Sequence, residues 1–178
     1  MVTLCLLYTS GFNRDGQLGD GTKTNNSIPK QIGTGFSAVT AGSEHTVALK
    51  SDGSLWAWGG NTYGELGDGA ITSSATPRLI GNGFSLVKTS ISFSMGAEGY
   101  NTVALKNDGS LWAWGNNWSG QLGDGTNTNS SVPKQIGTGF SDVATSVGKT
   151  VAVKRDGDVY KRQLQCRALL PRPFLNYQ

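Results

Sequence analysis

The sequence predicts an all-β fold, namely a fragment of a β-propeller built from four-stranded antiparallel blades. Its 178 residues include 26 glycines and five tryptophans, and only 15% are charged, which is typical of short strands joined by tight turns. One motif pattern recurs three times along the chain. No segment has the 3.6-residue apolar periodicity of an amphipathic helix, and none has the run of about 18 apolar residues that a membrane-spanning helix needs.

An internal repeat is the strongest signal for this fold. A Gly-x-Leu-Gly-Asp-Gly motif begins at Gly16, Gly64 and Gly120. The copies are 48 and 56 residues apart, and a Gly-x-Gly-Phe-Ser motif repeats with the same two spacings. The extra residues of the middle unit fall within 88–100. We expect them to lengthen a hairpin loop, because blade strands tolerate no insertion.

Each repeat unit is expected to hold four short strands. Two of them, Thr46–Lys50 and Ser54–Trp58, are linked by a Ser-Asp-Gly turn at 51–53. An Asp-Gly step suits a tight hairpin because glycine adopts positive φ without steric cost. The other two strands are expected near Pro29–Ile32 and along Phe36–Ala41.

A unit of this size cannot bury both faces of its sheet alone, and radial stacking of such units produces a propeller. One face of each blade should meet the next blade and the other face the previous one. The residues expected between neighbouring blades are Val47, Leu49, Leu55 and Ala57 with their equivalents. Trp56 and Trp58 share the opposite face of their strand.

Both ends of the chain differ in kind from the middle. Every glycine lies within 11–157, whereas both cysteines lie outside it. The hexapeptides at 5–10 and 158–163 can be encoded by one DNA element read in opposite orientations. That element resembles the transposase adaptor used to fragment DNA for sequencing. We therefore expect residues 1–10 and 158–178 to be translated adaptor, the latter with a wrong-frame tail. Survival of these codons in an independently amplified gene would contradict this expectation.

Setting the two ends aside changes the interpretation of charge and cysteine. The net charge of +3 arises in residues 158–178, since the 11–157 stretch holds 11 Lys/Arg and 11 Asp/Glu residues. A neutral repeat region argues against nucleic acid as a partner, because phosphate binding needs a basic surface. Cys5 and Cys166 are not expected to form a natural disulfide. The natural N-terminus is expected to be missing, so no cellular localisation is predicted from a targeting signal.

A long motif runs through the repeats: Leu-Trp-Ala-Trp-Gly-x-Asn-x-x-Gly-Gln-Leu-Gly-Asp-Gly, then Pro-x-x-Ile, then Thr-Val-Ala-Leu-Lys-x-Asp-Gly. This pattern, over residues 11–157, resembles the RCC1 repeat of the regulator of chromosome condensation family. The resemblance implies a seven-bladed propeller, of which this chain carries about three blades. It also implies action by protein contact, either guanine-nucleotide exchange on a small GTPase or inhibition of a secreted enzyme, as in the β-lactamase-inhibitor propellers.

The sequence lacks the residue clusters that catalysis, cofactor binding or metal binding would require. His45 is the only histidine, and its equivalents are Asn101 and Lys149, so a structural or surface role is expected. The glycine-rich loops match no phosphate-binding motif. The Trp-Ala-Trp strands are expected to be buried between blades. We therefore predict no catalytic, cofactor or metal site, and a protein that is not an enzyme.

One aspartate recurs between glycines in every unit, as Asp20, Asp68 and Asp124. Its repetition in each blade favours a turn-capping role, in which the carboxylate accepts backbone N–H bonds. Calcium binding is the alternative, because an oxygen-rich Asp-Gly-Thr-Asn-Thr-Asn stretch begins at Asp124. That stretch lacks the spacing and the terminal glutamate of an EF-hand.

Positions that vary inside these otherwise constant loops are candidate partner-binding residues. They are the pairs Arg14 and Asp15, Thr62 and Tyr63, and Trp118 and Ser119. Trp, Tyr and Arg are favoured at interface hot spots, and a tryptophan in a glycine-rich loop is expected to be exposed. Neutral drift of solvent-exposed loops is the alternative explanation.

We predict a non-catalytic scaffold for protein–protein interaction, whose partner is another protein of unknown identity. The alternative is a carbohydrate-binding or cell-wall-binding propeller, or a structural module of a larger extracellular bacterial protein. Exposed aromatics and abundant Asn, Ser and Thr favour that alternative. Glycan binding that is abolished by Trp118→Ala would distinguish the two.

Overall fold

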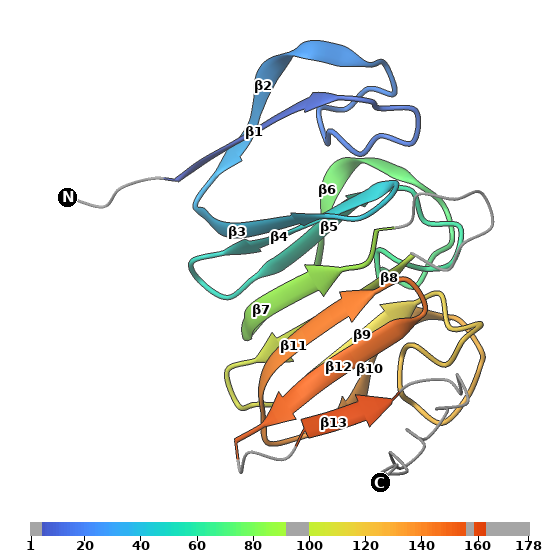
Figure 1. The fold of residues 1–178 in the computed structure, drawn as a ribbon. Helices are drawn as coiled ribbons and strands as arrows, with labels where there is room; N and C mark the ends of the chain where they lie inside the picture. Colours follow the sequence, from blue (N-terminus) through green and yellow to red (C-terminus); the bar gives the residue numbers. More distant parts are fainter. Residues whose placement is uncertain (1–4, 92–99, 156–158, 163–178) are drawn as a thin grey trace, which may run out of the picture.

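The computed structural model describes residues 5–91, 100–155 and 159–162, which form antiparallel sheets arranged in an arc (Figure 1). Strands are the regular structure of this part, and it contains no helix. A helix able to cross a membrane is accordingly not found among these residues. The predicted all-β class is confirmed.

The strands pair into four sheets in chain order. The first contains β1 (Leu6–Gly11) and β2 (Asn26–Thr34). The second contains β3 (Phe36–Ala41), β4 (His45–Lys50), β5 (Leu55–Gly59) and β6 (Ser74–Gly81). The third contains β7 (Phe84–Thr89), β8 (Asn101–Lys106), β9 (Leu111–Gly115) and β10 (Ser130–Gly137). The fourth contains β11 (Phe140–Ser146), β12 (Lys149–Lys154) and β13 (Val159–Arg162).

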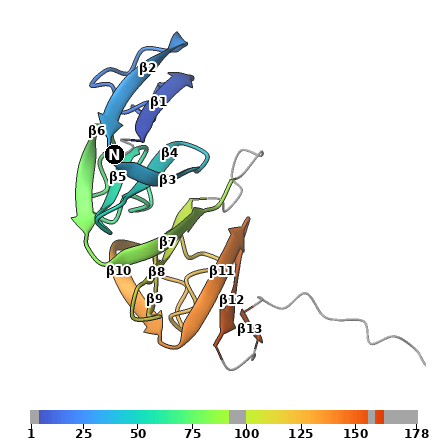
Figure 2. The ribbon, with the colours of Figure 1, turned by 90° about the vertical axis from the view of Figure 1, so that its left-hand side faces the viewer.

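Each of the two complete sheets is a four-stranded blade, as predicted, and its strands lie in sequence order. The predicted grouping of strands was wrong in one respect, because the segment near Pro29–Ile32 lies in β2, which pairs with β1, and β6 completes the blade of β3, β4 and β5. Strands β3, β7 and β11 contact one another from blade to blade, whereas β6 and β10 form the opposite edges of their sheets. Figure 2 shows the resulting arc, in which each sheet is turned relative to the one before it. This arrangement is that of consecutive propeller blades.

The hairpin between β4 and β5 shows why these sequences form strands. Its register pairs Val47 with Ala57 and Leu49 with Leu55, so that four apolar side chains share one face. The turn is held by Asp52, whose Oδ1 accepts hydrogen bonds from the backbone N of Ser54 at 2.9 Å and from its hydroxyl at 2.6 Å. The turn predicted from the Ser-Asp-Gly sequence is therefore confirmed.

The apolar face of the first complete blade is buried against the second. Val47, Leu49, Leu55 and Ala57 are at most 5% exposed and form one cluster with residues of the next blade, among them Phe84, Val87 and Trp114. Complete burial of one such leucine stabilises the fold by about 1.5–3 kcal/mol. Trp58 belongs to a separate cluster with Leu7 and Phe36. The predicted division of the two strand faces is thus confirmed.

The ends and the insertion bear on the expected domain organisation. Residues 6–10, which fall in the predicted adaptor segment, form most of β1 and pair with β2. This pairing does not test the origin of those codons, so the adaptor boundaries at 1–10 and 158–178 stay a prediction.

The insertion of the middle unit lies between the end of β7 and the start of β8. Residues 92–99 of that predicted loop lie outside the described residues.

Candidate functional site

Three long loops gather at one end of the blades. They connect β1 to β2, β5 to β6 and β9 to β10, and they lie on the right in Figure 1. We call this side the loop end. The Asp-Gly hairpin turns at 51–53 and 107–109 lie at the other end, because each strand of the hairpin runs the length of the blade.

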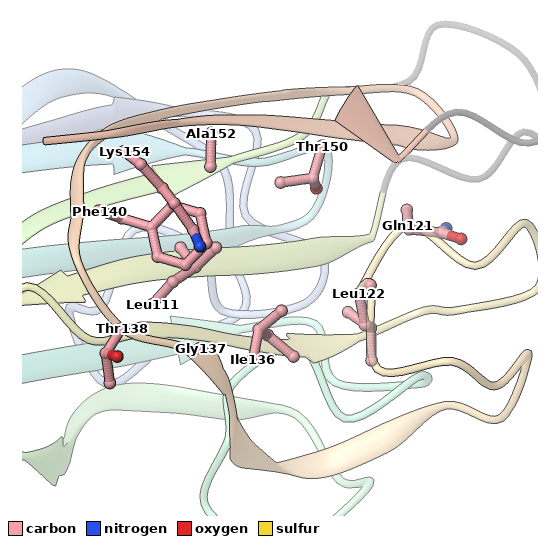
Figure 3. Close-up of a pocket in the computed structure, with 11 residues that line it drawn as sticks. Leu111, Gln121, Leu122, Ile136, Gly137, Thr138, Phe140, Thr150, Ala152 and Lys154 are labelled. Carbon is pink, nitrogen blue, oxygen red and sulfur yellow. The ribbon is translucent and has the colours of Figure 1, made fainter. Parts of the chain in front are cut away.

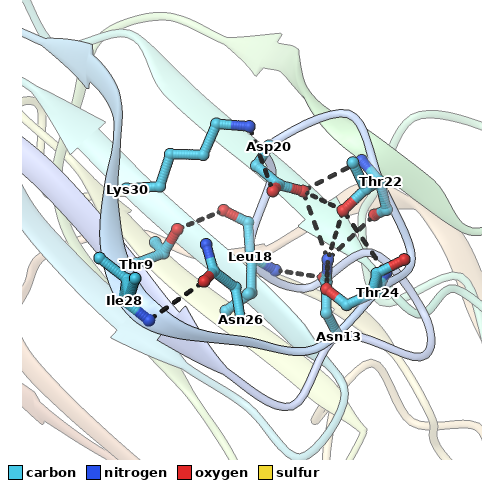
Figure 4. Close-up of polar contacts among 9 residues, drawn as sticks. All are labelled: Thr9, Asn13, Leu18, Asp20, Thr22, Thr24, Asn26, Ile28 and Lys30. Atoms are coloured by element: carbon cyan, nitrogen blue, oxygen red, sulfur yellow. Dashed lines mark hydrogen bonds and ion pairs between the residues drawn. The ribbon is translucent and has the colours of Figure 1, made fainter.

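A buried asparagine organises each loop, at Asn13, Asn61 and Asn117. In the first loop, Nδ2 of Asn13 donates to Asp20 Oδ1 at 3.3 Å and to the carbonyls of Thr22 and Thr24, while its Oδ1 accepts from the backbone N of Leu18 at 2.9 Å (Figure 4). The other two asparagines make the same set of bonds. The sequence signal for this role is their recurrence in the constant x-Asn-x-x-Gly pattern, which by itself does not reveal the bonds that they make.

The recurring aspartates cap the same loops. Asp20 Oδ1 accepts from the hydroxyl of Thr22 at 2.7 Å and from its backbone N at 3.0 Å, and Oδ2 pairs with Lys30 at 3.3 Å. Asp68 pairs with Arg78, and Asp124 with Lys134 at 2.9 Å. The hydrogen bonds to Asp20 lower its pKa to about 2, and the bond from the Thr22 hydroxyl has the largest effect. The turn-capping prediction is confirmed.

The first two of these loops are also fixed to the following blade. The indole Nε1 of Trp58 donates to the carbonyl of Gln17 at 2.9 Å, and that carbonyl also accepts from Thr46 Oγ1 at 2.8 Å. The next pair of blades repeats this geometry, with the carbonyl of Glu65 accepting from Trp114 at 3.0 Å and from the Thr102 hydroxyl at 2.9 Å. These two loops are therefore held by hydrogen bonds to the following blade as well as by bonds within their own blade.

The variable residues sit at the tips of the three loops. Arg14, Thr62 and Trp118 are exposed, while Asp15, Tyr63 and Ser119 are half-buried. Each half-buried residue donates its backbone N–H to the side chain two positions on. These bonds run from Asp15 to Gln17 at 3.0 Å, from Tyr63 to Glu65 at 2.7 Å and from Ser119 to Gln121 at 2.9 Å.

The structure brings two of the three variable pairs into contact. The rings of Tyr63 and Trp118 meet edge to face, with centroids 5.2 Å apart, although they belong to loops of different blades. Tyr63 also lies 5.1 Å from the ring of Tyr100, just before β8. Trp118 is 53% exposed, as expected. The sequence analysis did not identify Tyr100 as a candidate. This position also varies between units, since its equivalents are Glu44 and Gly148, and that variation could have identified it.

Carboxylates lie beside these rings. Burial raises the pKa of Glu44, and the charge of Asp15 raises it further. Burial likewise raises the pKa of Tyr100, as do the charges of Glu44, Glu65 and Asp15. We define the loop-end patch as Asp15, Glu44, Tyr63, Tyr100 and Trp118. The remaining variable residues, Arg14, Thr62 and Ser119, flank it in the sequence and stay candidates.

Glu65 lies beneath the patch and is 0% exposed. Its Oε2 accepts the backbone N–H of Tyr63, but Oε1 is buried and finds no hydrogen-bond partner among the described residues. Burial is the main cause that raises the pKa of Glu65 to about 7, and the neighbouring charge of Glu44 adds to it. The equivalent residues are glutamines, Gln17 and Gln121.

His45 is buried between the first two complete blades, at 1% exposure. Its Nε2 lies 3.1 Å from Oγ1 of Thr102, across the blade junction. Burial lowers the pKa of His45 to about 4, so the ring is neutral. This places His45 in a structural position, one of the two that the sequence left open. Within the described ranges, no three His, Cys, Asp or Glu side chains converge as metal ligands.

A cavity of about 200 Å³ lies between β9, β11 and β12 (Figure 3). The described residues that line it are partly apolar, such as Leu111, Leu122, Ile136 and Phe140, and partly polar, and they include no Asp, Glu, His or Cys. One blade earlier, Leu66 packs with the indole of Trp114 at the equivalent place. The cavity therefore corresponds to a position of core packing between blades.

The fold and the repeated loops together define a class, a β-propeller built from repeats with long loops at one end. The family model described as the regulator of chromosome condensation (RCC1) repeat matches residues 6–49, 52–100 and 108–153. A second model of the same repeat matches 36–65 and 91–121. The chain belongs to the RCC1-repeat family.

Similar proteins include the ultraviolet-B receptor UVR8 of Arabidopsis thaliana, 33% identical over 161 residues. That match covers 84% of this chain and 35% of UVR8. The E3 ubiquitin-protein ligase HERC2 of Homo sapiens is 30% identical over 163 residues, which cover 86% of this chain and 3% of HERC2. The chain thus spans 35% of the first relative and 3% of the second.

Solved structures share the fold at low sequence identity. Human WBSCR16 superposes with a TM-score of 0.65 at 20% identity, covering 88% of this chain and 44% of that protein. Prp20p from Saccharomyces cerevisiae, whose structure is described together with its binding properties to Gsp1p and histones, superposes with a TM-score of 0.67 at 19% identity. That match covers 82% of this chain and 38% of Prp20p. These likenesses support the propeller fold.

Proposed function

We propose that this chain is a non-catalytic scaffold that binds another protein through its loop end. The contact between Tyr63 and Trp118 carries the proposal, because two variable loops of different blades place their aromatic rings together at the surface. Exposed, clustered aromatics are the typical anchors of protein interfaces. Prp20p, which shares the fold, is described as binding two kinds of protein.

The test uses substitutions that the chain itself supplies. Trp118→Thr and Tyr63→Ser introduce the residues found at the equivalent positions, Thr62 and Ser119. Both variants should therefore fold. Proteins retained by the immobilised wild-type chain should be lost from the double variant. Retention of the same proteins at the same level by both would contradict binding at the loop end.

Guanine-nucleotide exchange is the narrower form of this function. It requires only protein contact and no catalytic side chain. A nucleotide-release assay with a panel of small GTPases tests it directly. An absence of accelerated release across the panel would remove exchange while leaving the general scaffold function in place.

Carbohydrate binding is the second candidate, favoured by the 53% exposure of Trp118 and by the neighbouring tyrosines. Aromatic faces together with carboxylates also suit sugar rings. A glycan array with the wild-type chain and Trp118→Ala distinguishes this function. Binding that depends on Trp118 would support it, and an array without signal would exclude it for the sugars tested.

A further inference from the structure

We propose that the loop-end patch is a receptor for an arginine side chain presented by a partner protein. This inference rests on the proposed scaffold function and specifies what the scaffold recognises. It combines charge, burial and ring geometry, all of which belong to the middle of the three loops and its immediate neighbours.

The first observation is a set of acidic groups without a cation. Asp20, Asp68 and Asp124 each form an ion pair with a lysine or arginine. Within the described parts of the chain, Glu44 and Glu65 form none. Asp15 forms none either, although the exposed Arg14 is its neighbour in sequence. Like charges held together without a counterion favour the arrival of a positive group.

The second observation is a pair of differences between the middle unit and the third unit. In the third unit, Nε2 of Gln121 donates to Oδ1 of Asn116 at 2.7 Å, so that one amide is bonded to the other. The middle unit has Glu65 and Gly60 at these two positions. The amide donor and its acceptor are both lost, and a carboxylate replaces them.

Gly60 also makes room for a second carboxylate. A Cβ built at Gly60 would lie 3.0 Å from Cβ of Glu44 and 3.5 Å from its Oε2. A side chain at position 60, such as the asparagine of the third unit, would therefore crowd Glu44. Glu65 of this loop and the neighbouring Glu44, which precedes β4, thus bring two carboxyl groups to this place.

The third observation is the buried oxygen of Glu65. Its side chain is fully buried, and Oε1 has no hydrogen-bond partner among the described residues. A buried acceptor left unpaired is costly, and the cost falls if a donor or a positive charge arrives nearby. A cation held by Glu44 and Asp15 would supply that field directly above Glu65.

The fourth observation concerns the aromatic rings. At the opposite end of the blades, Lys50 lies 4.7 Å from the ring of Trp56, and Lys106 lies 4.6 Å from that of Trp112. Those aromatic groups thus carry their own cations. In the described residues no lysine or arginine lies over Tyr63, Tyr100 or Trp118. The patch has ring faces and carboxylates, and a partner can supply the missing cation.

Arginine suits this combination better than lysine. Its guanidinium is planar, so it can stack on an aromatic ring while its N–H groups bind a carboxylate in the plane. The patch offers both at once, with Trp118 and Tyr63 beside Glu44 and Asp15. Lysine would satisfy the charge but not the stacking, and a sugar would satisfy the stacking but not the charge.

The experiment measures binding of a fluorescein-labelled peptide of alternating arginine and glycine to the full chain at pH 8. The counterpart peptide carries citrulline, which keeps the shape of arginine but has no charge. We expect the citrulline peptide to bind about tenfold more weakly, and the double variant Y63S/W118T to lose about tenfold in affinity for the arginine peptide. Binding should also weaken as salt is added.

Two further variants sharpen the test. Glu65→Gln restores the residue found at positions 17 and 121 and should lower affinity about threefold while the chain stays folded. Leu79→Gln, an exposed position on β6, is the matched control and should leave affinity unchanged. The thermal unfolding midpoint of each variant shows that it is folded.

Equal binding of the arginine and citrulline peptides would overturn the proposal, as would an unchanged affinity in Y63S/W118T. A peptide that fails to bind while a glycan does so through Trp118 would also overturn it. If partner proteins are captured by the loop end but the arginine peptide is not bound, the scaffold function stands and arginine recognition falls. If the loop end neither captures partner proteins nor binds the arginine peptide, both the scaffold function and arginine recognition are refuted.

Discussion

Gly67 lies against the indole of Trp114, so closely that a Cβ built on it would sit 2.7 Å from Nε1. The same indole nitrogen donates to the carbonyl of Glu65 at 3.0 Å. The β5–β6 loop of one blade therefore closes over the central hairpin of the next blade. Gly19 and Trp58 repeat this relationship at 2.6 Å. The close approach explains why a glycine is needed at this point of the repeat.

Gly67→Ala should destabilise the chain by about 3 kcal/mol. The methyl group would collide with Trp114, and the backbone at φ +80° disfavours any side chain. Gly69→Ala is the matched control, since Gly69 has φ +85° but its nearest contact is the flexible Val132 at 3.9 Å. That variant should lose only about 1 kcal/mol. Urea unfolding measures both, and equal losses would contradict a steric role for the indole.

Asn61→Ala should cost about 3 kcal/mol, because it leaves several buried partners unsatisfied. Asn61 donates to Asp68 and to the carbonyls of Ala70 and Thr72, each at 3.2 Å, and accepts from the backbone N of Leu66 at 3.0 Å. The exposed Asn82 provides the control, and Asn82→Ala should change the free energy of unfolding by less than about 0.5 kcal/mol. Similar losses in the free energy of unfolding for the two variants would contradict the organising role of Asn61.

Glu65 should make the chain less stable as pH rises. Its pKa is about 7 when folded, against an ordinary value of 4.5, so between these values the folded state binds the extra proton. Stability therefore falls as pH rises from 4.5 to 7 and levels off above. Glu65→Gln removes this loss and should be about 2 kcal/mol more stable than the wild type at pH 8, with little difference near pH 4.5. Urea unfolding across this range would refute the idea if the difference were constant.

His45 should have the opposite pH dependence. Its pKa is about 4 when folded, against 6.5 ordinarily, so the unfolded state binds more protons between these values. Stability contributed by the neutral ring is lost as pH falls from 6.5 to 4. Between pH 7 and 5 the wild type should lose about 2 kcal/mol of its free energy of unfolding through this titration. The variant His45→Asn, which has the residue found at Asn101, should not show this loss. The comparison belongs in the Glu65→Gln background, where the opposing titration is absent. Identical pH profiles with and without His45 would refute it.

Arg162→Trp should stabilise the last blade. The backbone register pairs position 162 with Thr150, as Trp114 pairs with Thr102. The cavity of about 200 Å³ lined by Leu122, Gly123 and Thr150 would then receive an indole, with a gain of about 1–2 kcal/mol. Hydrogen exchange of the β12 amides should slow. Val159→Trp at the start of β13 serves as the control, and an equal effect there would argue against this cavity.

The sequence alone determined the local structure of each unit. An Asp-Gly turn and a strand with alternating side chains are encoded within a few residues, so the β4–β5 hairpin and the faces of Val47 and Trp58 could be predicted. Asp20 could be assigned a capping role because it recurs between glycines in every loop. The family resemblance rested on the same local motifs.

Only the tertiary structure decided what the loops build together. Tyr63 and Trp118 are 55 positions apart, and their contact at 5.2 Å depends on the rotation from one blade to the next, which no local pattern encodes. The neighbourhood of Glu44, Glu65 and Tyr100 was hidden for the same reason. A repeat tells which positions are equivalent. The distance between them depends on how the blades pack, and packing is set by the side chains buried between the sheets.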